Sequence, residues 1–469
     1  MTMTEPLAMF MITTVASALL ILAGVGLRRF IPALGKMHMP AAVTGGILGM
    51  LLGPQVLGLL YVDTDFGHHV KDIYKASKEL PAFFISVVFA ALMVGKPLPS
   101  IRKIWKEASP HLVVGYTTAW GQYVVGCLVA IMVLVPFLDA NALSAALIPI
   151  GFQGGYGTAA GLANTYGKLD FAEGYDLAIG MATAGKIAAI LVGLLLVNLA
   201  VKRKKMISPE DAKKEDTRGA VPDHQARKDF KQKREEQYFS ADTLIIHFAI
   251  LCLAIAIGFA LREALALLES AFVADPAEGI VQYIPLFPMA LIGGFFVQYT
   301  IELCGWQKHL NEHHIHSISH SFLDMLIVVA IATISLKVLA EYWQVLAILF
   351  GAGLAWNLAI FFFLAPLVYR NKPWERGVSD FAHATGAATT AMMLVKVIDP
   401  TDKSGARGGF TLKQPFYETI VGGGLLTALS LPIMATIGLW PTMIFFSILT
   451  VATLVFGFTY LRIRRNNPL

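Results

Sequence analysis

Two glycine- and threonine-rich stretches, Gly151-Phe-Gln-Gly-Gly-Tyr-Gly-Thr-Ala-Ala-Gly161 and Ser379-Asp-Phe-Ala-His-Ala-Thr-Gly-Ala-Ala-Thr-Thr-Ala391, lie within long apolar sequence in the two halves of the chain. A helix that crosses a bilayer needs about 20 predominantly apolar residues, and neither stretch reaches this length. Backbone that is not a spanning helix is tolerated at membrane depth only where protein buries it or where it lines a water-filled cavity. A pair of such interruptions at corresponding places in two repeats is typical of a secondary transporter's binding site.

The composition points to the membrane. Of the 469 residues, 56% are apolar and only 15% are charged, which leaves too little polar surface for an ordinary soluble globule. The chain has no Walker-type phosphate loop and no metalloprotease or nucleophile-elbow motif, so the sequence supports neither direct ATP drive nor an enzyme. We therefore expect an all-α membrane protein with no cofactor and no nucleic-acid partner.

The apolar stretches predict five spans in each half of the chain and one additional span at the C-terminal end. The predicted spans of the first half are Ala8–Leu27, Pro40–Tyr61, Leu80–Val94, His111–Phe137 and Leu177–Val201. Those of the second half are Thr243–Leu261, Ile280–Ile301, Phe322–Leu339, Val345–Tyr369 and Phe416–Ile437, and the additional span is Trp440–Leu461.

Basic residues predict the orientation. A Lys- or Arg-containing segment follows every odd-numbered span, as Arg28 and Arg29 follow the first and Arg464 and Arg465 the last. Because Lys and Arg accumulate in cytoplasmic loops, we expect the N-terminus outside and the C-terminus in the cytoplasm. The charged segment 202–240 is then a cytoplasmic linker.

The two halves also share a motif. Met39-Pro-Ala-Ala-Val-Thr-Gly-Gly46 matches Phe287-Pro-Met-Ala-Leu-Ile-Gly-Gly294 in the spacing of its Pro and its Gly-Gly pair. Five spans per half is an odd number, so the two units must enter the membrane from opposite sides. We expect a first inverted repeat at 1–201 with a re-entrant segment at about 143–165. We expect a second at 241–437 with a re-entrant segment at about 379–397, and then an extra span and basic tail at 438–469.

This order of motifs, ending in Gly154-Gly-Tyr-Gly-Thr-Ala-Ala160 and His-x-Thr-Gly-Ala-x-x-Thr-Ala from His383, resembles the bacterial sodium/glutamate symporter (ESS) family. The resemblance implies two inverted five-span repeats, each with a re-entrant segment, in a homodimer whose mobile core moves against a scaffold. It also implies sodium-coupled uptake of an anionic amino acid at the bacterial inner membrane. The chain departs from the expected pattern at Tyr156, where the family motif has His, and in its additional span after Leu439.

The interruptions supply the candidate binding groups. Their glycines let the backbone approach a ligand closely, and exposed N–H groups at the following helix starts favour a carboxylate. Carbonyl and Thr hydroxyl oxygens are hard donors suited to sodium. The alternative is that small residues here only permit tight helix packing. The predicted substrate-binding residues are Gln153, Gly154, Gly155, Tyr156, Gly157, Thr158, His383, Thr385, Gly386, Thr389, Thr390 and Lys186.

Two ionisable residues fall within predicted spans. Lys186 and Asp324 would each cost roughly 2.5–3.5 kcal/mol on insertion scales, so such residues usually face a partner or a wet pathway. Lys186 is expected to pair with Asp324, to contact a substrate carboxylate or to replace a sodium ion. The alternative is that Lys186 extends to the membrane surface and that Asp324 ends a helix. The predicted ion-binding or coupling residues are Thr158, Thr385, Thr389, Asp324 and Lys186.

Histidines raise two further hypotheses. His383 and Asp380 are candidates for a proton relay, although Asp380 as a helix cap is the alternative. The histidines between His309 and His320 have helical spacing, but without cysteines and with a single nearby carboxylate they favour a solvated loop over a metal site. We expect no structural metal.

The sequence thus predicts a secondary active transporter that couples sodium to glutamate or a similar small anionic amino acid or carboxylate by alternating access. A proton-coupled or sodium-independent carboxylate transporter is the alternative, and a passive channel is a further one. Sodium, the anionic solute, the lipid bilayer and a second copy of the chain are the expected partners.

Overall fold

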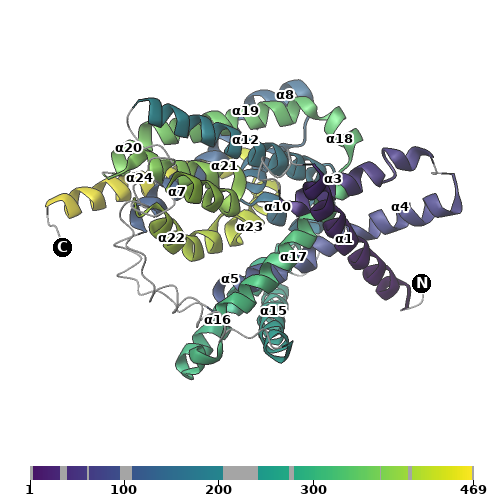
Figure 1. The fold of residues 1–469 in the computed structure, drawn as a ribbon. Coiled ribbons are helices and arrows are strands. Elements are labelled where there is room, and N and C mark those ends of the chain that lie inside the picture. Colours follow the sequence, from purple (N-terminus) through teal and green to yellow (C-terminus); the bar gives the residue numbers. More distant parts are fainter. Residues whose placement is uncertain are drawn as a thin grey trace.

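The computed structural model describes residues 4–31, 40–60, 63–95, 108–203, 241–273, 279–369, 371–399 and 404–466, and across them the protein is helical without a strand (Figure 1). Twelve helices in these ranges are long and apolar enough to cross a membrane. The all-α, multi-pass membrane class is confirmed. Most of the predicted linker at 202–240 lies outside the described residues.

The helices of the first half are α1 (Thr4–Phe30), α3 (Ala41–Leu52), α4 (Asp65–Ser77), α5 (Leu80–Met93), α7 (Ser109–Val129), α8 (Val135–Leu138), α9 (Leu147–Phe152), α10 (Gly155–Gly161), α11 (Ala163–Lys168) and α12 (Gly174–Lys202). Those of the second half are α15 (Ala241–Ser270), α16 (Leu286–Leu303), α17 (Glu312–Ala332), α18 (Leu336–Glu341), α19 (Trp343–Ala359), α20 (Ala365–Val368), α21 (Pro373–Ile398), α22 (Ala406–Ile420), α23 (Leu425–Ile437) and α24 (Leu439–Asn466).

One candidate span differs from the sequence-based expectation. Helix α21 covers the segment that we predicted to be re-entrant, and by length and composition it could cross the membrane. Its helical geometry is interrupted at Gly386 and Ala387, however, so α21 consists of two shorter pieces. Neither piece approaches the roughly 20 residues that a straight crossing takes. Composition alone therefore does not decide whether this segment crosses or re-enters.

The helices form two bundles (Figure 1). Helices α1, α3, α4, α5, α15, α16 and α17 pack together as one bundle, and α7, α9, α12 and α19 to α24 pack as the other. Helix α10 contacts both bundles, because it lies against α12 on one side and against α5 and α17 on the other. Each half of the chain thus contributes helices to each bundle.

The shared Gly-Gly motif has matching roles in the two halves. A Cβ on Gly45 would lie 2.4 Å from the Leu20 carbonyl oxygen, and one on Gly293 would lie 2.0 Å from that of Ala254. These glycines let α3 cross α1 and let α16 cross α15. The second glycines are equally matched, since Gly46 lies against α17 and Gly294 against α5, each a helix of the opposite half.

A second feature recurs just before each interruption. Helix α7 continues into a π-helical segment, η2 (Ala130–Leu134), and then into α8 with its Pro136. Helix α19 continues in the same way into the π-helical η7 (Ile360–Leu364) and then into α20 with its Pro366. The C-terminal helix α24 packs on α7, where the Phe446 ring stacks on the Tyr123 ring with centroids 4.0 Å apart.

Candidate functional site

The two glycine-rich interruptions are breaks that touch each other. The first follows α9, and α10 begins at Gly155 with a left-handed φ of +61°. The second lies within α21, where Ala387 has a left-handed φ of +69° and ψ of 168°. A Cβ built on Gly155 would lie 3.2 Å from the Ala387 Cβ. Segments more than 200 residues apart in sequence therefore meet at their non-helical residues.

Ala387 occupies backbone space that is essentially reserved for glycine. A non-glycine residue in such a conformation costs on the order of 1–3 kcal/mol and persists only where the surroundings enforce it. Sequence analysis pointed to the neighbouring Gly386 and missed Ala387, since alanine carries no signal of a positive φ. Strained backbone of this kind tends to occur at functional sites.

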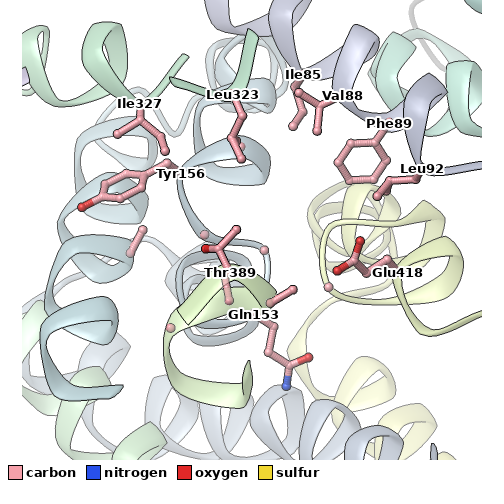
Figure 2. Close-up of a pocket in the computed structure, with 18 of the residues that line it drawn as sticks. Ile85, Val88, Phe89, Leu92, Gln153, Tyr156, Leu323, Ile327, Thr389 and Glu418 are labelled. Atoms are coloured by element: carbon pink, nitrogen blue, oxygen red, sulfur yellow. The ribbon is translucent and has the colours of Figure 1, made fainter. Parts of the chain in front are cut away.

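A cavity of about 210 Å³ opens where the breaks meet, between the two bundles (Figure 2). Helices α5 and α17 form one side of it, and the breaks with α22 form the other. The predicted site residues that line it are Gln153, Gly154, Gly155, Tyr156, Gly157, Lys186, Gly386 and Thr389. The further lining residues with polar side chains are Ser319, His320 and Glu418.

The predicted side chains differ in where they point. Thr389 projects into the space between α17 and α22, whereas the Gln153 amide points away from Phe89 and Glu418 (Figure 2). The Gln153 Oε1 accepts a hydrogen bond of 2.5 Å from the Tyr417 hydroxyl. Gln153 thus connects the first break to α22.

Lys186 lies beside Tyr156. Its Nζ is 5.5 Å from the centroid of the Tyr156 ring, and the Tyr156 hydroxyl donates to Thr183 Oγ1 at 3.1 Å. Lys186 also lines a second cavity of about 220 Å³, together with Asp324, Thr389 and Thr390. No ion pair between Lys186 and Asp324 occurs among the described residues. The two side chains line the same cavity without a direct salt bridge.

The threonines at the two breaks differ in whether their hydroxyl groups already form hydrogen bonds. Thr390 Oγ1 donates to the Gly386 carbonyl at 2.6 Å, and Thr385 Oγ1 donates to Phe381 at 2.8 Å. Thr158 Oγ1 is buried and has no hydrogen-bond partner among the described residues. It lies against Gly423, where an added Cβ would approach it to 2.2 Å. Of these three threonines, Thr158 is therefore the one whose buried hydroxyl has no partner among the described residues.

Two buried amides hold the end of the first half of α21. A break in a helix leaves the preceding carbonyls without helical partners. The Ala384 carbonyl accepts hydrogen bonds from Gln122 Nε2 on α7 at 2.8 Å and from Asn357 Nδ2 on α19 at 3.0 Å. Gln122 Nε2 also donates to Asn357 Oδ1 at 2.9 Å. Sequence analysis missed both residues, although an amide within an apolar span was an available signal.

Asp380 and His383 belong to a buried ionic cluster. Asp380 Oδ1 lies 2.8 Å from the Lys413 ammonium, and Asp380 Oδ2 contacts His111 Nδ1 at 2.9 Å and the Tyr369 hydroxyl. His383 Nδ1 lies 3.2 Å from Lys413 Nζ. Neither Asp380 nor His383 lines the cavity.

Lys413, like Glu418, is a residue that sequence analysis overlooked. The predicted tenth span began at Phe416, so Lys413 counted as a loop residue and Glu418 as a residue at a span end. In the structure α22 already begins at Ala406 and continues to Ile420. An ionisable residue next to a predicted span was the available signal.

The histidines of the second half do not gather into a metal site. In the part of the chain that the structure describes, no group of three or more metal-binding side chains occurs. His316 and His320 stack on α17 with ring centroids 4.1 Å apart, and His320 lines the cavity.

One comparison with known proteins identifies a family. The model of the sodium/glutamate symporter family matches residues 7–398, which include both breaks and all of the helices named above except α22, α23 and α24. A search of curated proteins finds no match to the chain. The match extends over more than half of the sequence, so this chain belongs to the sodium/glutamate symporter family.

Proposed function

We propose that this protein is a sodium-coupled symporter that takes up glutamate, or a similar small anionic amino acid or carboxylate, across the bacterial inner membrane. The observation that carries the proposal is the meeting of two helix breaks at a cavity between two bundles. Broken helices at the interface of two repeats are where secondary transporters bind substrate and coupling ion.

The charges at the cavity suit an amino acid with an extra carboxylate. Lys186 lies over the Tyr156 ring, and Figure 2 shows Tyr156 and Glu418 at opposite ends of the cavity. Glutamate carries an ammonium group and two carboxylates. We infer that Lys186 attracts a substrate carboxylate and that Glu418 attracts the ammonium group.

The division into two bundles supports alternating access as the mechanism. The bundle with α1, α5 and α17 serves as the scaffold, and the bundle with both breaks moves against it as an elevator-like core. The matching packing of Gly45 with Gly293 and of Gly46 with Gly294 supports two inverted repeats that exchange helices. The homodimer, the external N-terminus and the cytoplasmic C-terminus remain expectations of the family and of the basic-residue pattern.

Sodium has suitable oxygen donors at the breaks. The Thr158 hydroxyl is uncommitted among the described residues, and carbonyl oxygens of non-helical backbone are donors that suit a cation. Lys186 supports the alternative of proton-coupled or sodium-independent transport, because a fixed ammonium at the cavity opposes a second cation.

Uptake into proteoliposomes tests the proposal. Glutamate, aspartate and dicarboxylates are offered under a sodium gradient alone and under a proton gradient alone, to wild type and to Lys186→Leu. We expect concentrative glutamate uptake with sodium alone, and a KM at least tenfold higher in Lys186→Leu. Uptake by wild type with the proton gradient alone would establish the alternative, and equilibration without accumulation would indicate a channel.

A further inference from the structure

The Lys413 ammonium is removed from water and surrounded on all sides. The Lys413 side chain is 0% exposed and that of Asp380 3%. Besides the Asp380 carboxylate at 2.8 Å and His383 Nδ1 at 3.2 Å, the ammonium faces the rings of Phe410 and Tyr417, with centroids 4.8 and 4.6 Å away. A carboxylate, an imidazole lone pair and two aromatic faces are the surroundings that stabilise a monovalent cation.

The Asp380 carboxylate is itself shared between several helices. Its second oxygen contacts His111 at the start of α7 and Tyr369, which follows α20. Lys413 belongs to α22, so the cluster connects four parts of the bundle that carries both breaks. A buried carboxylate that loses its counter-cation is strongly destabilising, so these parts depend on the ammonium.

The cluster also reaches the first break. Tyr417 lies one helical turn after Lys413, and its hydroxyl donates a hydrogen bond of 2.5 Å to Gln153 Oε1. Asp380 and His383 lie less than two turns before the second break at Gly386. The ammonium is therefore placed behind the cavity, between the segments that form both breaks.

We propose that Lys413 is a tethered cation that permanently fills a monovalent-cation position between the two broken segments. In this position the side chain does what a bound ion from solution would otherwise do, because it neutralises Asp380 and holds α21 to α22. The position is distinct from the cavity and from Lys186. Its consequence for transport, which rests on the proposed function, is that this positive charge stays with the protein in every cycle.

A shorter side chain at position 413 leaves the monovalent-cation position unfilled. Lys413→Ala removes the propylammonium part of the side chain and leaves Asp380 with His111 and Tyr369 but without the ammonium at its Oδ1. We expect a cation from solution to enter beside Asp380. Sodium and ammonium ions are the probes, and choline is the control because it is too large for the space that is left.

The test measures the melting temperature of the purified full-length protein in detergent without substrate, with sodium, ammonium or choline chloride at equal ionic strength. In choline, Lys413→Ala should melt several degrees below wild type. Sodium or ammonium should stabilise Lys413→Ala more than either ion stabilises wild type, and Lys413→Ala/Asp380→Asn should not show this additional stabilisation. The matched control is Lys396→Ala, which alters an exposed lysine on α21 and should behave as wild type.

The proposal is overturned if Lys413→Ala responds to the three salts as wild type does. If Lys413→Ala yields no folded protein, the neutral pair Lys413→Met/Asp380→Asn decides. The double variant should then give folded protein in higher yield than Lys413→Met, and equal or lower yield would overturn the proposal. Melting requires no transport, so a protein that carries a solute other than glutamate still provides the same test.

Discussion

The first break and the second break meet at one cavity but are held in different ways. At the first, Gly155 adopts the left-handed conformation without a Cβ, and α10 packs closely on α5. At the second, Ala387 adopts a glycine-like conformation and the preceding segment is held by Gln122, Asn357 and the Lys413 cluster. One break is tolerated because its residue is small, and the other because polar contacts enforce it.

The largest effect is expected where the breaks touch. In Gly155→Leu, a side chain would have to fit at a φ of +61° and within 3.2 Å of the Ala387 Cβ. The left-handed conformation alone costs an L-residue about 1–2 kcal/mol, and the clash adds to it. We expect uptake to fall at least a hundredfold in proteoliposomes.

The matched control is Gly167→Leu, because a Cβ at Gly167 meets no atom within 4 Å. Because the new side chain meets open space, the rate of uptake by this variant should be within about twofold of that of wild type. Equal loss in both variants would show that the contact of the two breaks is not the cause.

The amides that hold the second break should give the next largest effect. Asn357→Leu leaves the Ala384 carbonyl with one donor fewer and Thr385 without its amide partner. A buried polar group without its partner costs about 1–3 kcal/mol, so the melting temperature and the rate of uptake should both fall. The control Gln344→Leu changes an exposed amide on the same helix α19 and should leave both unchanged.

Removal of the strain at the second break should stabilise the protein, whereas the previous substitutions impair it. Ala387→Gly relieves a conformation that costs on the order of 1–3 kcal/mol, against an entropic penalty for glycine of about 0.5–1 kcal/mol. We expect a higher melting temperature. A lower one would mean that Ala387 is not strained, and that the two breaks are held alike.

The smallest effect concerns the two threonines that follow the breaks. Thr158 has no partner for its hydroxyl among the described residues, whereas the Thr390 hydroxyl donates to its own helix. If the free oxygen serves sodium, Thr158→Val should raise the sodium concentration for half-maximal uptake severalfold, and Thr390→Val less. Equal shifts in the two variants would contradict this distinction.

The sequence predicted the membrane class and the family, and it identified both breaks from their glycines. It did not predict the conformation of Ala387, because that conformation occurs where two distant segments meet, next to Gly155. Lys413 and Glu418 were missed because α22 begins well before the apolar run that suggested a span. The pairing of Lys186 with Asp324 followed from charge alone, and the structure places both residues at one cavity without a close ion pair between them. Contacts between distant segments were thus the part that a single sequence could not supply.

The most direct test of the shared site is an experimental structure determined with sodium and glutamate. Our account predicts density for the amino acid in the cavity, in contact with residues of both breaks, with its carboxylates toward Lys186 and its ammonium group toward Glu418. Density that lies outside this cavity, or that contacts only one of the two breaks, would contradict the account.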